Sequence, residues 1–65
     1  MITVLEEIKT GLQKNGRELY RRVYLVADGK TALPTDAAPG SVALIRSGES
    51  TVTKMLFPDG VWAKI

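Results

Sequence analysis

The second half of this chain is divided into short segments by residues that favour turns. Pro34 and Pro39 each fix φ at about −65° and push the preceding residue toward an extended conformation, so we expect a stiff connector here and not a helix. Two runs rich in β-branched and apolar residues follow, Ser41–Arg46 and Thr51–Phe57, with the turn-forming cluster Ser47–Ser50 between them. Such runs between turn signals are typical of strands. The pattern therefore predicts short strands joined by tight turns.

A second turn is expected at Phe57-Pro58-Asp59-Gly60-Val61, where proline presets φ and glycine accepts a positive φ. The last strand should then run over Val61–Ile65. It contains the single tryptophan, Trp62. The simplest role for this side chain is a large hydrophobic anchor of a small core, and the alternative is a subunit contact.

In the first half of the chain, the segment Glu18–Ala27 reads as a strand. Its end, Val23–Val26, is apolar on both faces and is expected to lie centrally in a sheet. By alternation, one face of this strand carries Leu19, Arg21, Val23 and Leu25, and the other carries Tyr20, Arg22, Tyr24 and Val26.

The N-terminal segment allows two interpretations. Thr3 and Glu6 have the spacing of a capping box, and apolar residues follow at helical intervals, which favours a short helix over residues 3–14 ended by Asn15-Gly16. Gly11 inside such a helix costs about 1 kcal/mol relative to alanine. In the alternative, Asn15-Gly16 is a type I′ turn between Thr10–Lys14 and Arg17–Tyr20. The short helix is the preferred interpretation.

The length of 65 residues allows one domain, residues 1–65. A chain this short has a small core, and small domains usually need a disulfide, a metal or a partner subunit. The sequence has no Cys and no His, which excludes disulfides and removes the usual zinc ligands, so self-association or docking on a larger assembly remains. The predicted fold is mainly β: a small four-stranded meander or partial barrel with a short N-terminal helix.

The residues give little support to catalysis. Without His or Cys, most nucleophile and base pairs cannot be built, and the carboxylates Asp28, Asp36, Glu49 and Asp59 fall in turn-forming segments. We therefore expect a protein that is not an enzyme and that has no cofactor and no metal site. No run of 18 apolar residues is present, so we also expect no membrane-spanning helix.

A basic and aromatic stretch offers an alternative function in nucleic-acid binding. Stacking aromatic rings between cations can bind single strands. The net charge of +2 is small, however, and half-buried tyrosines edged by arginines explain the same pattern in a sheet, so nucleic acid is not the expected partner. The candidate contacts would be Arg17, Tyr20, Arg21, Arg22 and Tyr24.

The segment Leu33–Ile45, beginning Leu-Pro-Thr-Asp and continuing through Pro39-Gly40-Ser41, resembles a motif of short tailed-phage and prophage virion proteins. Together with the ending Asp59–Ile65, it looks like head-fibre and similar accessory proteins, and in outline like the trimerising foldon of phage fibres. The chain departs from these relatives at Ser47–Ser50, where they commonly have an Asp-Thr-Gly type turn, and it lacks a long fibre segment.

This resemblance implies a structural role in a virion, as a head or neck decoration or a fibre-associated protein made in the cytoplasm of a bacterial host. The expected partners are further copies of the chain, with a trimer favoured, and capsid or neck proteins. The residues expected at the oligomer or docking interface are Leu44, Met55, Phe57, Val61 and Trp62.

Overall fold

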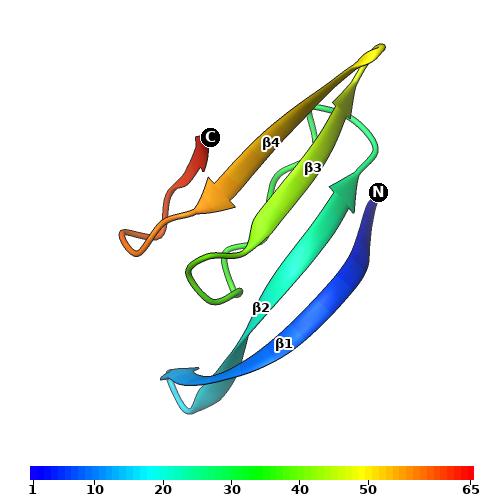
Figure 1. Ribbon diagram of the computed structural model, residues 1–65. Coiled ribbons are helices and arrows are strands. Elements are labelled where there is room, and N and C mark those ends of the chain that lie inside the picture. The colour runs from blue at the N-terminus through cyan, green and yellow to red at the C-terminus, as the bar shows by residue number, and fades with distance from the viewer.

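A computed structural model describes residues 1–65 as one mixed sheet whose five strands lie in sequence order, from β1 at one edge to β5 at the other (Figure 1). The mainly β prediction is therefore confirmed. The four-stranded meander or partial barrel is corrected, because five strands form one sheet with β1 and β5 at its edges and one neighbouring pair is parallel. The strands are β1 (Ile2–Lys14), β2 (Arg17–Val26), β3 (Val42–Ser47), β4 (Ser50–Leu56) and β5 (Trp62–Lys64).

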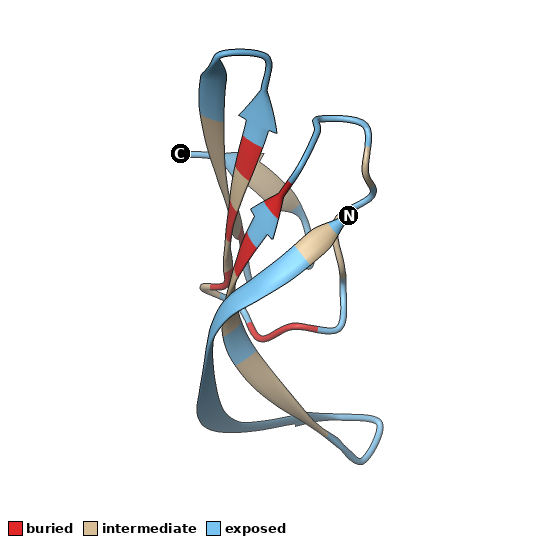
Figure 2. Ribbon diagram, turned by 90° about the vertical axis from the view of Figure 1, so that its right-hand side faces the viewer, coloured by how far each residue is buried: buried red, intermediate tan, exposed pale blue.

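The one parallel pairing joins β2 to β3, with Val23 opposite Val42 and Val26 opposite Ile45. All other neighbours are antiparallel hairpin partners. Parallel strands cannot be joined by a tight turn, so the chain must cross from one end of the sheet to the other. The crossover, residues 27–41, runs along one face of the sheet, as the edge-on view shows (Figure 2).

The predicted N-terminal helix is wrong, since residues 2–14 form the longest strand of the sheet. The alternative interpretation is the correct one: Asn15 and Gly16 have φ values of 53° and 78°, as a type I′ turn requires, and Lys14 pairs with Arg17. This turn twists in the same sense as the strands that it joins. A helix of about 12 residues is marginal in water on its own, whereas the strand pairs along almost all of β2.

The apolar spacing that suggested a helix also has an explanation in the strand. The register of β1 against β2 shifts twice, between Val4 and Glu6 and between Lys9 and Gln13. Gly11 lies in the second irregularity with φ of 79°. There the Thr10 hydroxyl donates to the carbonyl of Leu19 at 2.7 Å. Such bulges break the strict alternation of a strand, which hides its period in the sequence.

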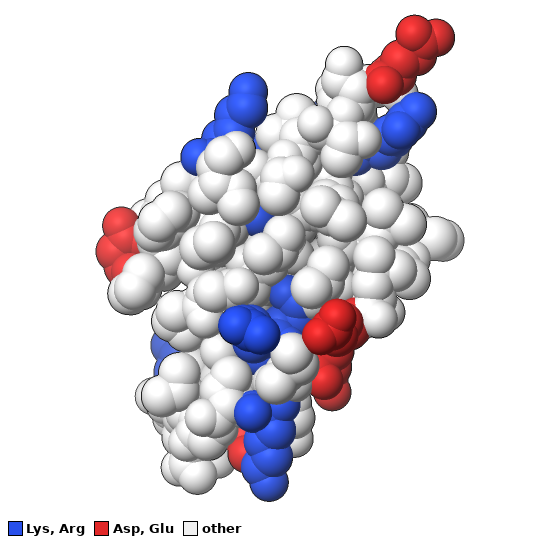
Figure 3. Space-filling model, in the orientation of Figure 1, with Lys and Arg blue, Asp and Glu red and all other residues white.

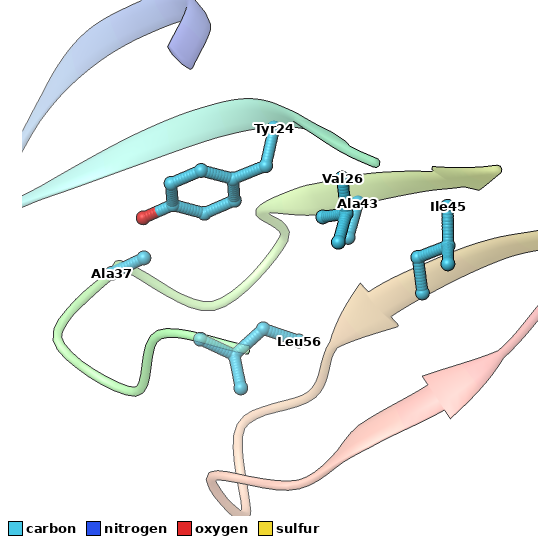
Figure 4. Close-up of a cluster of buried hydrophobic side chains, with 6 residues drawn as sticks. All are labelled: Tyr24, Val26, Ala37, Ala43, Ile45 and Leu56. Atoms are coloured by element: carbon cyan, nitrogen blue, oxygen red, sulfur yellow. The ribbon is translucent and has the colours of Figure 1, made fainter. Parts of the chain in front are cut away.

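The core lies between the sheet and the crossover (Figure 4). Tyr24 points toward Ala37 of the crossover, Val26, Ala43 and Ile45 lie together farther along the sheet, and Trp62 packs against this cluster from β5. Trp62 also donates its indole N–H to the carbonyl of Pro34 at 2.8 Å. The cluster consists of Tyr24, Val26, Ala37, Ala43, Ile45 and Leu56.

The turn chemistry expected from the sequence is present around this core. Gly60 has φ of 83°, and the Asp59 carboxylate accepts from the backbone N–H of Val61 at 3.0 Å, which confirms the last turn. The crossover begins with a similar turn, in which one Asp28 oxygen accepts from the N–H groups of Lys30 and Thr31. The hydrogen bond from the backbone N–H of Lys30 and that from the Thr31 hydroxyl lower the pKa of Asp28.

Hydrogen bonds of the Ser41 side chain join the end of the crossover to β2. Its side chain is fully buried, donates to the carbonyl of Ala38 at 2.7 Å and accepts from the backbone N–H of Arg22 at 3.1 Å. Next to it, the N–H of Ala38 donates to the carbonyl of Tyr20 at 2.9 Å. The hydroxyl therefore replaces a missing strand partner at the point where the parallel pairing begins.

We expect Ser41→Ala to destabilise the protein by about 1–3 kcal/mol, because it leaves the N–H of Arg22 and the carbonyl of Ala38 without this partner in a buried place. Thermal and urea unfolding would measure the change. The matched control is Ser47→Ala at an exposed strand end, which should stay within about 0.5 kcal/mol of the parent. Equal stability of the two variants would contradict a fastening role for Ser41.

Candidate interaction surface

The two faces of the sheet differ in what covers them. Along β3, buried Ala43 and Ile45 alternate with half-buried Val42 and Leu44. Along β2, buried Tyr24 and Val26 likewise alternate with residues that are not buried. Because successive strand side chains point to opposite faces, the crossover covers one face and no part of the chain covers the other.

This uncovered surface, called the open face below, is largely apolar at its centre. Two cross-strand rows follow from the register, one through Leu25 and Leu44 and the other through Val23, Val42 and Met55. Figure 3 looks onto this side of the sheet, where uncharged atoms dominate over β3 and β4. None of its apolar side chains is buried, and Leu25 is 44% exposed. The central residues of the open face are Val23, Leu25, Val42, Leu44, Met55 and Ala63.

Charged residues lie at the margin of the open face. Arg46 stands two residues beyond Leu44 on β3, and Glu6 and Arg21 are at the opposite end, on β1 and β2. A shallow hollow of about 310 Å³ lies at that end, lined by Ile8, Val23, Val42 and Met55 beside Glu6 and Arg21. An apolar centre with a polar rim is the usual composition of a protein–protein interface.

The size of the molecular surface shows that the chain is less compact than an average domain of its length. The folded chain exposes 4530 Å², against roughly 4,100 Å² for a folded monomer of this mass. Its radius of gyration is 11.7 Å, compared with about 10.7 Å for a compact domain of 65 residues. Only 8 of 65 residues are buried. The sheet and the crossover form two packed layers, and the opposite side of the sheet has no layer over it.

The edges of the sheet are less suited to contact than the open face. The outer edge of β1 is interrupted by its two register shifts and carries Glu6, Glu7 and Lys9. Bulges and charges are the usual means by which proteins protect an edge strand from pairing. At the other edge, β5 has only three residues, Trp62–Lys64.

The five residues expected at an interface lie in three places. Leu44 and Met55 belong to the open face. Trp62 lies on the covered face, where its ring meets that of Tyr24 edge-on with 6.2 Å between centroids. Phe57 and Val61 flank the last turn, joined by a backbone hydrogen bond, and are 38% and 56% exposed. They therefore do not form one patch, and Trp62 serves as a core anchor.

The residues of the nucleic-acid alternative are also separated. Tyr24 is 2% exposed and belongs to the core. Arg22 donates through Nε to a Glu7 oxygen at 2.7 Å and lies 5.6 Å from the centre of the Tyr20 ring. Hydrogen bonds to the Tyr24 hydroxyl and to Glu7 raise the pKa of Arg22, and the ion pair with the Glu7 carboxylate compensates its charge within the fold.

The remaining two members of that set, Arg17 and Arg21, are exposed. Arg17 follows the Asn15-Gly16 turn, and Arg21 lies at the rim of the hollow. Two exposed arginines without the tyrosines make a weak stacking platform. The carboxylates Asp28 and Asp59 serve their turns, and no three Asp or Glu side chains converge as metal ligands would.

Sequence reasoning missed four of the six central residues of the open face, Val23, Leu25, Val42 and Ala63. A signal for Val23 and Leu25 was present, because Val23–Val26 is apolar on both sides of the strand. That pattern indicates two apolar faces but does not say which of them the chain itself covers. The structure also contains no helix with the length and apolar character needed to cross a bilayer.

Comparison with known proteins adds no assignment: no family model, curated protein or solved structure matches this chain.

Proposed function

We propose that this protein is a structural component that works by protein–protein association through its open face, in the manner of a phage virion accessory protein. The observation that carries the proposal is the uncovered apolar face itself. Larger exposed apolar patches rimmed by polar residues mark interaction sites in soluble proteins. The resemblance of Leu33–Ile45 and Asp59–Ile65 to virion proteins supplies the setting, a head, neck or fibre assembly.

The balance between the entropy cost of folding and the burial of apolar surface supports a function by association. Ordering a chain costs about 1.5 kcal/mol per residue, and the burial of apolar surface must offset this cost. With 8 of 65 residues buried and no cysteine in the chain, the isolated sheet has a small core for its length. Covering Leu25, Leu44 and their neighbours with a partner would complete the second apolar layer. The trimer expected from the resemblance stays a prediction.

A nucleic-acid function is the alternative from a different class, and its support is weaker. The β1–β2 hairpin carries exposed Lys14, Arg17 and Arg21, which could contact phosphates. Lys9 is already paired with Glu18 at 3.5 Å, and Arg22 with Glu7. The net charge of +2 leaves little surplus for a polyanion.

We expect the solution mass to be a multiple of the monomer mass, and the melting temperature to rise as protein is added, because folding and association are linked. Sedimentation and thermal melts across a wide concentration range would measure both. Leu25→Lys places a charge on the open face and should lower the mass toward the monomer. Val61→Lys is the control, since Val61 is 56% exposed at a turn outside the face.

A monomer at high micromolar concentration, with a melt independent of concentration, would contradict self-association. Docking on a larger virion surface would then be the surviving form of the structural proposal. If the protein does self-associate, equal effects of Leu25→Lys and Val61→Lys on the mass would contradict the open face as the site of contact.

For the virion setting, we expect peptides of this chain in phage particles purified on a density gradient from the strain that encodes it. Mass spectrometry of the gradient fractions would detect them. The chain should follow the particle fractions and not the soluble fractions above them. Its absence from particles that contain the other head and neck proteins would contradict the virion role.

The two proposed functions differ in how binding should depend on the salt concentration. Phosphate contacts weaken steeply as salt rises, whereas apolar contacts do not. We expect neither the parent protein nor Arg21→Gln to be retained on a DNA column at physiological salt. Strong retention that Arg17→Gln and Arg21→Gln both reduce would favour the alternative function.

A further inference from the structure

We propose that the partner of the open face is the open face of a second copy of this chain, packed about a twofold axis with the two sets of strands in opposite directions. The result is a two-sheet sandwich. This inference rests on the proposed function, because it names the partner at the same surface. It commits to a dimer in place of the expected trimer.

The open face is self-complementary in shape. Its row at one end carries the two leucines, Leu25 and Leu44. Its other end has the hollow of about 310 Å³ lined by Ile8, Val23, Val42 and Met55. A twofold axis that reverses the strands places the leucines of each copy over the hollow of the other. The same contact is thereby made twice, as an isologous interface requires.

The dimensions of the face fit this arrangement. The molecule measures 39 × 21 × 16 Å, and its thin direction leaves room for the sheet and the crossover only. The extents of 39 and 21 Å include the β1–β2 hairpin, which projects beyond β3 and β4 (Figure 1), so a face-to-face contact covers at most on the order of 800 Å², the area per partner of a standard stable interface. Stacked sheets lie about 10 Å apart, so the side chains of two such faces can interdigitate.

A threefold arrangement uses the face less completely. Around a threefold axis three flat sheets meet as a wedge, and only the part of each face near the axis touches a neighbour. The outer part, including either the leucine row or the hollow, would stay in water. Reversal of the strands brings Arg46 of each copy to the end of the other that carries Arg21, where Glu6 is the acidic group that can offset the two like charges.

The contact can be observed without changing the sequence. A sample mixed from isotope-labelled and unlabelled protein gives isotope-filtered nuclear Overhauser effects between copies only. We expect such effects from the Leu25 and Leu44 methyl groups to those of Ile8, Val23 and Met55, at a mass of two chains. A trimeric mass, or effects from Leu44 to Phe57 or Val61, would overturn the twofold pairing while leaving self-association intact.

Two substitutions on one strand give an independent test. Ile8 and Val4 both belong to β1 and are 39% and 49% exposed, but Ile8 pairs with Arg21 on the open face and Val4 with Tyr24 on the covered side. We expect Ile8→Lys to weaken the dimer by roughly tenfold or more and Val4→Lys to leave it unchanged. Amide dispersion in each variant's spectrum checks that both fold. A folded Ile8→Lys dimer of parental affinity would overturn the proposal.

Discussion

The parallel pairing of β2 with β3 is the constraint on which the rest of this structure depends. Parallel neighbours need a connection that spans the length of the strands, and here that connection is the irregular segment 27–41 in place of the usual helix. Pro34 and Pro39 reduce the conformational freedom that such a segment loses on folding. Ser41 and the Trp62–Pro34 hydrogen bond then hold it against the sheet.

A crossover made of one extended segment can cover only one face of a sheet. The core consequently forms between this segment and the inner side chains of β2, β3 and β4. The other face also carries apolar residues, among them Leu25, Leu44 and Met55, without a layer over them. The surface proposed for association thus results from the way in which residues 27–41 connect the parallel strands β2 and β3. It requires no separate binding loop.

The long β1–β2 hairpin adds a different property. Every residue of β1 after Ile2 is exposed, so this strand is held mainly by its backbone pairing with β2. Its bulges and charges protect the outer edge from further pairing. The proposed association is thereby directed away from the edge and toward the open face. Ile8 is the place where the hairpin contributes to that face, at the margin of the hollow.

Local chemistry in the sequence determined the turns and most of the strands. Pro58-Asp59-Gly60 and Asn15-Gly16 specify backbone angles that few other residues accept, and the runs between them are short and β-rich. The N-terminal strand was not predicted, because Gly11 and the neighbouring bulge interrupt the alternation of apolar and polar residues. The apolar spacing that remains resembles that of a helix. Pairing with β2, a tertiary contact, decided in favour of the strand.

The sequence by itself therefore determined the β-rich character of the chain and its turns. It also showed that Val23–Val26 is apolar on both sides. Only the tertiary structure decided which side the crossover covers, that Trp62 belongs to the core, and that Leu44 and Met55 remain outside it. The physical reason is that the burial of these side chains depends on the path of residues 27–41 across the sheet. The local sequence of a strand does not specify that path.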